Sequence, residues 1–445
     1  MKKYIKKSVR ISLVTLLGIL ICAGCGNQKI VEEIQETIVQ DAEEIGVLNN
    51  ESNIFGTQES LANTESQQEI TTESTETSSQ AATEAVVETS AEPELTQPST
   101  SLTLLMVGDI LLHTPVENAA QQADGTYDFT AIFENLTEDI QVTDLAIVNQ
   151  EVIIGGEELG ISGYPAFNAP YAVGDALVEA GFDVVCHGTN HALDKGRKGI
   201  LNCSNFWDEN YPEIAVLGIH NSQESQDTIY IYEQNDMKIA ILNYTYGTNG
   251  IALPDGMPYA VDMLEEQRVI ADIQKAEELA DFTIVCPHWG TEYQLEQSAA
   301  QEKWAQIFVR NGVDLVLGTH PHVIQPIEWV TDEETGHEML VYYSLGNFVN
   351  WTSESGKGIA NRMVGGMAEV TLERSEEGQV QIAEYGVVPV VCHLEQGING
   401  VTVYKLEDYT EELAEKNQIR LQDAVFSKEY CEQLCEGVWA DIWGE

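Results

Sequence analysis

Short apolar runs alternate with longer amphipathic stretches from residue 101 onward. Each run is rich in Val, Ile and Leu and is bounded by polar turn residues. Eight such runs lie at residues 102–108, 144–149, 182–188, 215–219, 238–244, 282–287, 314–319 and 339–346. Runs that are apolar at consecutive positions are typical of strands in a sheet that is covered on both faces. The pattern therefore predicts eight buried strands.

Helix-like stretches separate these predicted strands. They lie at 175–181, after His191, at 261–279 and at 296–311. Alternation of strands and helices predicts an α/β fold built in layers. After Gly365 two further strands are predicted at 367–373 and 381–393, followed by an acidic helical part, and we expect these last elements to pack on the core.

The first 29 residues contain six basic and no acidic residues. The apolar stretch from Ile11 to Cys22 is short for a permanent membrane-spanning helix, and Ala23 and Gly24 then precede Cys25. The arrangement in residues 1–25 resembles a bacterial lipoprotein signal, in which acylation of the Cys25 thiol would tie the chain to the membrane. An uncleaved anchor helix is the alternative. Both interpretations place the body on the extracytoplasmic face of the bacterial cell membrane.

Residues 26–100 differ in composition from the rest of the chain. From Ile30 to Thr100 there are sixteen acidic and no basic residues, set among Ser, Thr, Gln and Ala. Little apolar area is available there to offset the entropy lost on ordering, and like charges repel one another. The segment is predicted to be a disordered acidic tether.

The charge of the chain argues against one class of partner. The formal net charge is −52, and from Ser101 onward 57 acidic residues face 15 basic ones, which leaves −42. Nucleic-acid binding needs clustered Lys and Arg that displace counterions from phosphates, and no run of them occurs beyond the first ten residues. We therefore expect no nucleic-acid partner, whereas cations should be attracted.

Polar side chains collect where the predicted strands end. These strand ends carry Asp109, Asn149 and Glu151, Asn190 and His191, His288, and His320 and His322. In α/β sheets the carboxyl ends of the strands face the ligand crevice. Carboxylate, amide and imidazole ligands without paired cysteines suit Zn, Mn or Fe, and a bridging carboxylate allows two ions about 3.5–4 Å apart. The sequence therefore predicts a site for two divalent metal ions.

Six segments occur in a fixed order between residues 102 and 350: VGDILLH, NQE, GTNHALDKG, PHWGTEY, GTHPHVIQ and YSLGNFV. Together they resemble the calcineurin-like metallophosphoesterase superfamily and, within it, the CapA family of capsule or poly-γ-glutamate biosynthesis proteins. The resemblance implies a layered αββα sandwich over residues 101–355. Strands and a helical extension at 356–445 would complete the domain.

The resemblance also implies a role for each matched residue. Asp109 and His322 would bind the first metal, Asn190, His288 and His320 the second, and Glu151 would bridge the two. His191 would be the catalytic group beside the metals that steadies or protonates a leaving oxygen, since imidazole titrates near physiological pH.

Two departures from the superfamily bear on activity. Ile110 and Leu111 follow Asp109, so the usual His two positions later is missing, and only a tight turn could bring His113 back in its place. Glu151 stands where a bridging Asp is usual, which changes the spacing but keeps the charge. A site for a single metal therefore remains an alternative.

Lys195, Arg197 and Lys198 form the densest basic cluster of the body. They could hold an anionic substrate, because the planar guanidinium of Arg197 can bind two oxygens of a phosphate or a glutamyl carboxylate. The alternative is a solvated helix face with Asp194 and Asp208 as partners.

The remaining candidates have weaker functional signals. His187 is expected to pack in the interior or to support a ligand, Tyr293 to line a pocket or pack in the core, and Asn347 to shape a turn. Cysteines in or near apolar runs are expected to be buried thiols. Cys431 and Cys435 share one face of a predicted helix, where a disulfide would be strained.

Two classes of function follow from the resemblance. The first is a lipid-anchored metal-dependent hydrolase, acting on phosphoesters or peptide-like bonds in the synthesis, export or anchoring of poly-γ-glutamate or a related polymer, with a membrane polymer synthase as a partner. The second is a non-catalytic scaffold that keeps the fold and binds polymer. The acidic body would repel a polyglutamate strand, although salt restricts that repulsion to about 8–10 Å.

Overall fold

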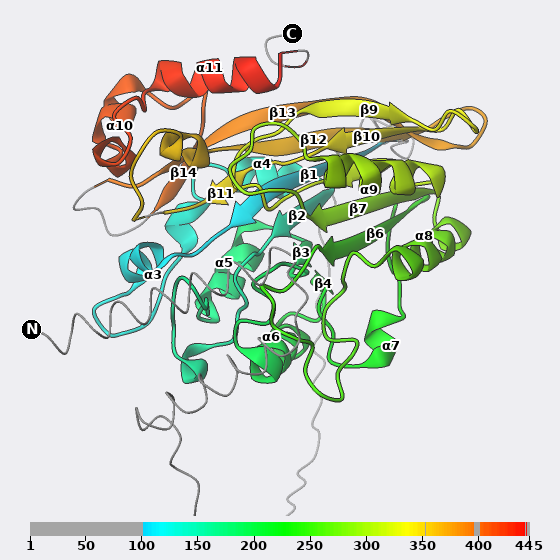
Figure 1. Cartoon of the computed structure of the whole chain (residues 1–445), viewed down its shortest axis with the longest axis horizontal. Coiled ribbons are helices and arrows are strands. Elements are labelled where there is room, and N and C mark those ends of the chain that lie inside the picture. The colour runs from blue at the N-terminus through cyan, green and yellow to red at the C-terminus, as the bar shows by residue number, and fades with distance from the viewer. Residues whose placement is uncertain (1–100, 352, 396–400, 441, 443–445) are drawn as a thin grey trace, which may run out of the picture. The chain divides into compact units, whose positions relative to one another are not determined.

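Two β-sheets lie face to face, and helices cover the outer face of each sheet (Figure 1). This computed structural model describes residues 101–351, 353–395, 401–440 and 442. The predicted lipoprotein signal with Cys25 and the predicted tether lie outside the described residues.

The first sheet combines parallel and antiparallel strands. In spatial order these are β14 (Thr402–Lys405), β13 (Val380–His393), β12 (Val364–Arg374), β1 (Ser101–Ile110), β2 (Leu145–Asn149), β3 (Val184–Cys186) and β4 (Ala215–Leu217), and β11 (Asn347–Val349) pairs with the end of β1. Strands β1 to β4 run parallel, while β12, β13 and β14 run antiparallel to their neighbours. The strands after Gly365 thus lie in the same sheet as β1.

The second sheet has a parallel centre and antiparallel edges. Its order is β5 (Tyr230–Gln234), β6 (Met237–Thr245), β7 (Phe282–His288), β8 (Leu315–Leu317), β10 (Glu338–Tyr342) and β9 (Ile327–Thr331). The edge strands β5 and β9 pair antiparallel with β6 and β10. The central strands pair parallel, so their carboxyl ends lie on one side of the sheet.

Helices connect the strands and follow them. They are α3 (Thr114–Ala120), α4 (Thr137–Val142), α5 (Ala172–Ala180), α6 (Gly196–Asn210), α7 (Gln223–Gln226), α8 (Glu266–Leu279), α9 (Ala299–Arg310), α10 (Glu411–Lys416) and α11 (Lys428–Val438), with short 3₁₀ helices η1 (Thr130–Ile132), η2 (Glu157–Leu159), η3 (Ile359–Met363) and η4 (Gln418–Leu421).

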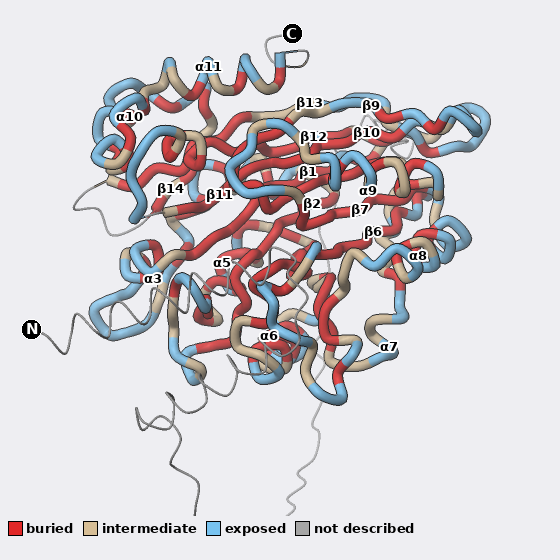
Figure 2. The backbone as a smooth tube through the Cα atoms, in the orientation of Figure 1, coloured by how far each residue is buried: buried red, intermediate tan, exposed pale blue. Residues whose placement is uncertain are grey.

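Period-two alternation along each strand separates three apolar layers. On β1, Leu104 and Met106 point between the two sheets, whereas Leu105 and Val107 point toward the helices on the outer face. Helices α5 and α6 cover the outer face of the first sheet, and α8 and α9 cover that of the second. Figure 2 shows the strands of both sheets as mostly buried. The predicted layered αββα fold is confirmed, because strands apolar at every position have a covered surface on each side.

The structure changes some predicted elements. The stretch predicted as a helix at 261–279 becomes helical only at Glu266, and the helix after His191 begins at Gly196. Strands β5, β9, β11 and β14 were not predicted. Strands β5 and β9 are partly exposed edge strands, so they lack the continuous apolar run that identified the central strands.

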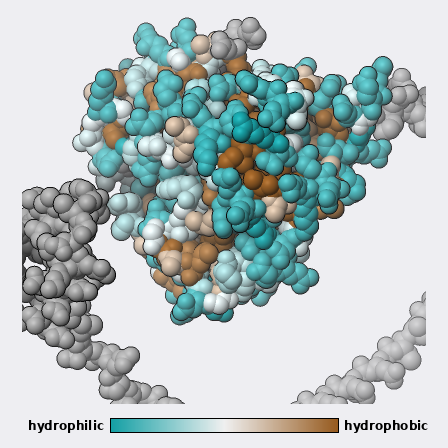
Figure 3. Space-filling model, turned by 45° about the vertical axis from the view of Figure 1, so that its right-hand side comes forward, coloured by the Kyte–Doolittle hydropathy of each residue, from teal (hydrophilic) through white to brown (hydrophobic). Residues whose placement is uncertain are grey.

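The surface drawn in Figure 3 is mostly hydrophilic, and the described cysteines are buried. On this face hydrophobic residues form separate small patches. Within the described part of the chain, every helix is too short or too polar to cross a membrane. The six cysteines of that part are buried free thiols, Cys431 and Cys435 of α11 among them.

Candidate metal centre

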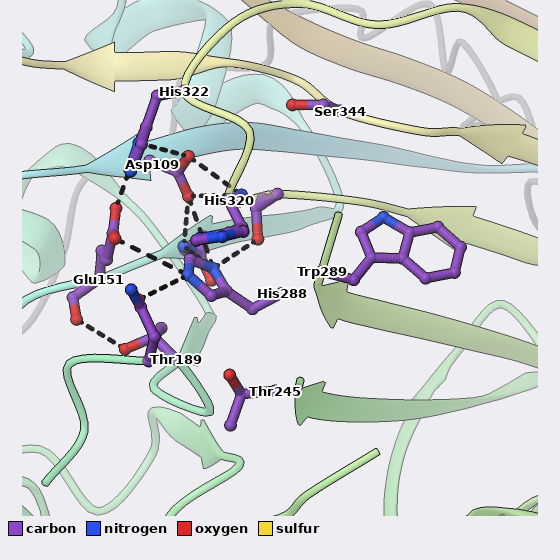
Figure 4. A network of polar contacts seen from close by, with 12 residues as sticks. Asp109, Glu151, Thr189, Thr245, His288, Trp289, His320, His322 and Ser344 are labelled. Atoms are coloured by element: carbon purple, nitrogen blue, oxygen red, sulfur yellow. Dashed lines mark hydrogen bonds and ion pairs between the residues drawn. The ribbon is translucent and has the colours of Figure 1, made fainter. Parts of the chain in front are cut away.

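Six side chains that the sequence singled out meet at the carboxyl ends of the strands, and Figure 4 labels five of them, Asp109, Glu151, His288, His320 and His322. The six are Asp109 near the end of β1, Glu151 beyond β2, Asn190 beyond β3, His288 at the end of β7, and His320 and His322 beyond β8. All six are buried, with 5% exposure or less. We call these six residues the ligand cluster.

Short contacts link the members of the ligand cluster. His322 Nδ1 lies 3.4 Å from Asp109 Oδ2, and His288 Nε2 lies 2.9 Å from Asn190 Oδ1. The two oxygens of Glu151 lie 3.7 Å from His288 Nε2 and from His322 Nδ1. Glu151 therefore lies between the His322–Asp109 pair and the His288–Asn190 pair.

Two sets of three potential metal ligands share Glu151. Asp109, Glu151 and His288 form one set, and Glu151, His320 and His322 form the other, with one ligand atom per residue and all ligand atoms of a set within 4.8 Å of one another. The assignment implied by the resemblance pairs these histidines differently, with His322 beside Asp109 and with His288 and His320 together. In both descriptions Glu151 is shared between the two groups of potential ligands.

The polar atoms of the cluster fit a divalent cation. Both carboxylate oxygens of Glu151 and Nδ1 of His320 are buried, and none of these atoms has a hydrogen-bond partner among the residues that the structure describes. A buried carboxylate without a donor is costly, because water no longer solvates it. A cation bound between the carboxylates and imidazoles would satisfy these atoms, and this mixed oxygen and nitrogen donor set suits Zn, Mn or Fe.

The electrostatics of the cluster agree with this fit. Burial, together with the neighbouring Asp109 carboxylate, raises the pKa of Glu151 well above its usual value, although His322 opposes the rise. Burial alone would lower the pKa of His322, but Glu151 and Asp109 outweigh it and raise that pKa to about 9. Burial and neighbouring imidazoles hold the pKa values of His288 and His320 well below normal, so these rings are neutral and keep a lone pair for a metal.

The backbone around the cluster is tightly constrained. A Cβ atom on Gly108 would lie 2.0 Å from the carbonyl oxygen of Gly346, so only glycine allows the chain before Asp109 to approach this closely. His320 and His322 both have positive φ, 99° and 59°. Such strain in residues other than glycine concentrates at functional sites. The His320 N–H donates to Asp109 Oδ2 at 3.1 Å, which ties the two segments together.

His191 lies beside the cluster in a pair with Asp194. Its Nδ1 is 2.6 Å from Asp194 Oδ2, and the same oxygen accepts a hydrogen bond from the Phe167 N–H at 2.7 Å. The Phe167 ring packs edge-on against His191 with centroids 4.6 Å apart. Because Nδ1 is engaged, Nε2 is the nitrogen that can exchange a proton with a substrate.

Comparison with known proteins identifies the family. Residues 103–352, more than half of the chain, match the family described as bacterial capsule synthesis protein PGA_cap. The chain belongs to this family. It is 28% identical over 269 residues to the capsule biosynthesis protein CapA of Bacillus anthracis, covering 56% of this chain and 61% of that protein. It is 29% identical over 180 residues to the PGA biosynthesis protein CapA of Bacillus subtilis (strain 168), covering 40% and 45%. The matches thus span about half the length of these relatives, and the predicted family is confirmed.

Solved structures to which the chain is similar include two nucleotidases. The Haemophilus influenzae NAD nucleotidase has a TM-score of 0.42 and 15% identity, over 65% of this chain and 58% of that chain. A 5'-nucleotidase precursor from Thermus thermophilus has a TM-score of 0.41 and 13% identity, over 76% and 58%. The assignment to the PGA_cap family depends on the sequence match.

In this PGA_cap family member, the predicted substrate-binding residues contact neighbouring loops. Lys195 Nζ donates to Ser162 Oγ at 2.8 Å, and Arg197 is exposed and donates to the carbonyl oxygen of Asp255 at 3.4 Å. Asp194, weighed as their partner, binds His191 instead. A substrate role for Lys195 and Arg197 stays a prediction.

Two further histidines take different places. His113 caps α3, contacts the Phe167 ring edge-on, and has a pKa lowered to about 4 by burial and then by His322 and His191. It therefore lies close to the site, although neither set of potential ligands contains it. His187 packs against α6, where it accepts a hydrogen bond from Trp207 Nε1 at 3.3 Å.

Sequence reasoning missed residues that surround the cluster. Asn249 contacts both Asn190 and His191 at 3.4 Å, and the Tyr246 ring lies 4.6 Å from the His320 ring. Arg362 stacks on Tyr293. Arg362 and Asn249 do not lie at the end of a predicted strand, so the signal that found the ligands does not apply to them. Tyr246 lies one residue beyond β6, where the position carried the signal but tyrosine is not a usual metal ligand. Asn347, expected only to shape a turn, also contacts His322 Nδ1 through its Oδ1 at 3.0 Å.

Proposed function

We propose that this chain is a metal-dependent hydrolase that acts in the synthesis, export or anchoring of poly-γ-glutamate or a related capsule polymer, and that it holds two divalent cations. The observation that carries the metal site is the burial of both Glu151 oxygens, without donors among the described residues, at the point shared by two sets of ligands. The polymer class is supported by the names of the relatives, a capsule and a PGA biosynthesis protein.

The residues of the site would have different chemical roles. The ligand cluster would hold the cations, which would polarise the phosphoryl or acyl oxygen of the substrate and lower the pKa of the attacking water. His191 would give a proton from Nε2 to the departing oxygen, while Asp194 fixes the orientation of the ring through Nδ1. Asn249 would hold the Asn190 amide in place beside His288.

A polymer-binding scaffold without catalysis is the second candidate. It is favoured by one feature of the sequence, the absence of the usual His two positions after Asp109, where Leu111 stands. The buried Ile110 and Leu111 side chains cannot bind a metal. In that case the fold would present polymer at the surface and the cluster would be structural.

One experiment separates the two candidates. Purified protein, loaded with Mn, Zn or Fe and checked by elemental analysis, is incubated with a generic phosphodiester and with poly-γ-glutamate. A hydrolase releases product from one of them, and a chelator abolishes the release. Intact polymer binding without product from either substrate rejects the hydrolase and supports the scaffold.

We also propose that the body is held on the extracytoplasmic face of the bacterial membrane through a lipid on Cys25, within reach of a membrane polymer synthase. The support is the order of basic, apolar and small residues before Cys25. Fractionation of cells that make the Cys25→Ala variant tests this. Retention of that variant in the membrane fraction, equal to wild type, would reject the lipid anchor.

A further inference from the structure

The ring of Tyr293 connects Arg362 to the ligand cluster. Its guanidinium carbon is 3.5 Å from the centre of the Tyr293 ring, and that centre is 5.9 Å from the centre of the His322 ring. These two contacts keep the guanidinium within about 9 Å of His322. The Tyr293 N–H donates to the carbonyl oxygen of Pro321 at 2.8 Å, between the two histidines of the loop. The stacked pair is therefore fixed to the loop that carries two of the metal ligands.

A second connection joins Arg362 to the same ligand. The Asn347 Nδ2 donates to the carbonyl oxygen of Arg362 at 2.9 Å, and Asn347 Oδ1 lies 3.0 Å from His322 Nδ1. One amide side chain thus contacts both the backbone of residue 362 and the ring of residue 322. Arg362 is thus held near the cluster at its backbone carbonyl by Asn347 and at its guanidinium by Tyr293.

The guanidinium has donor capacity left over. Arg362 is only 9% exposed, and its Nε is buried without a hydrogen-bond partner among the described residues. Its Nη1 donates to Glu354 Oε2 at 2.7 Å, and the Glu354 side chain is 63% exposed. The guanidinium already binds a carboxylate that water can reach. A buried Arg whose Nε lacks a partner among the described residues, and whose Nη1 binds an exposed carboxylate, is suited to planar recognition of an oxyanion.

The C-terminal extension holds this arginine in place. Arg362 belongs to η3, ten residues beyond the part that matches the family. Asp423 Oδ2 accepts hydrogen bonds from the N–H groups of Gly358 at 2.9 Å and Ala360 at 3.4 Å, and the Tyr430 hydroxyl donates to Asn361 Oδ1. The residues after 355 therefore build one wall of the site as well as completing the sheet.

We propose that Arg362 binds an oxyanionic group of the substrate, a carboxylate or a phosphate, beside the metal ligands, and that Glu354 occupies the guanidinium until the substrate displaces it. This inference rests on the proposed function, because it assigns a substrate contact to the same site. The stacking on Tyr293 supports a guanidinium at low solvent exposure. It also supplies a local cation in a body whose net charge is −42 and would otherwise repel anions.

The test measures anion affinity separately from catalysis. Inorganic phosphate and a short γ-linked glutamate oligomer are titrated calorimetrically into metal-loaded protein. Arg362→Met should weaken binding of whichever probe carries the recognised group by about 10- to 100-fold, the value of a charge-assisted hydrogen bond. Arg362→Lys should bind the probe more tightly than Arg362→Met but more weakly than wild type, because it keeps the charge but loses the planar fork. The probe that responds identifies the oxyanion as phosphate or carboxylate.

The matched control is Arg374→Met on β12, where a partly exposed arginine pairs with Asp281 at 2.8 Å, and it should bind both probes as wild type does. Glu354→Gln should tighten binding of the probe several-fold. A loss of affinity in Glu354→Gln as large as that in Arg362→Met would overturn the proposed displacement. Wild-type affinity in Arg362→Met with unchanged metal content overturns the proposal, as does failure of wild type to bind either probe. Arg362-dependent binding without hydrolysis would reject the hydrolase and leave this inference intact.

Discussion

His191 differs from the ligands around it because a carboxylate outside the cluster fixes its ring. Asp194 Oδ2 lies 2.6 Å from Nδ1, and the Phe167 ring packs against the imidazole. The other imidazoles of the site are surrounded by carboxylates and by one another. An imidazole held in this way is suited to proton transfer, whereas the others are suited to metal binding.

Replacing His191 by Ala should lower turnover and leave the metal content unchanged. The expected loss is about 10²- to 10⁴-fold, the usual contribution of a positioned proton donor. Asp194→Asn should cause a smaller loss, because the ring remains but its orientation is less fixed. Turnover numbers and elemental analysis on the same samples check both. His220→Ala is the matched control, since His220 forms a similar 2.6 Å pair with Asp262 in another part of the fold. Loss of metal in His191→Ala would make it a ligand instead.

At the scale of elements, the joint between β1 and β11 decides where Asp109 points. The pairing of β1 shifts register at this residue, which lies opposite Asn149 of β2 and Asn347 of β11. The Asp109 N–H donates to the carbonyl oxygen of Gly346 at 2.9 Å. Gly346 has φ of 65°, and a Cβ there would lie 3.0 Å from backbone atoms of Ile324 and Val364.

Gly346→Ala should therefore lower the free energy of unfolding by about 1–3 kcal/mol. The left-handed backbone conformation is unfavourable for alanine, and the added methyl group would lie against backbone atoms of Ile324 and Val364. Metal affinity should fall as well, since Asp109 is bonded to this residue. Urea unfolding measures the first effect and metal titration the second. Gly386→Ala on β13, where nothing lies within 4 Å of the added Cβ, should change neither. Equal stability of the two variants would contradict the argument.

At the scale of the whole molecule, the ligand cluster joins the two sheets. Asp109, Glu151 and Asn190 lie at or just beyond the ends of strands of the first sheet, whereas His288, His320 and His322 lie at or just beyond the ends of strands of the second. A layer of apolar side chains lies between the sheets, and the cluster adds a polar link at the carboxyl ends of the strands. A cation bound here would tie the halves of the sandwich together, and binding would favour the folded state over the unfolded chain.

Metal should accordingly raise the melting temperature. At a metal concentration about 100 times Kd the gain is about 2.7 kcal/mol, which corresponds to several degrees for a domain of this size. Glu151→Gln should lose most of the gain, because one carboxylate serves both sets of ligands. Glu151→Asp is the matched control, as it keeps the charge and should keep part of the gain. Thermal melts with and without chelator provide the measurement. An unchanged melting temperature in wild type that holds metal would refute the link between the sheets.

The sequence by itself determined the layered fold and the residues that gather at the strand ends. Both follow from local rules: consecutive Val, Ile and Leu predict strands covered on both faces, and parallel strands end at one edge. The predicted αββα sandwich and family are confirmed. The six predicted ligands lie together because they lie at or just beyond the ends of such strands, whereas their roles as ligands stay predictions.

Only the tertiary structure decided what surrounds those ligands. Arg362 and Asn249 reach the site from the C-terminal extension and from a loop, where no periodic pattern marks them. Lys195 and Arg197 contact neighbouring loops, and their substrate role stays a prediction. Periodicity specifies which face of an element is buried, but the neighbours that a loop residue meets depend on how distant segments pack, and that packing is fixed only when the whole chain folds.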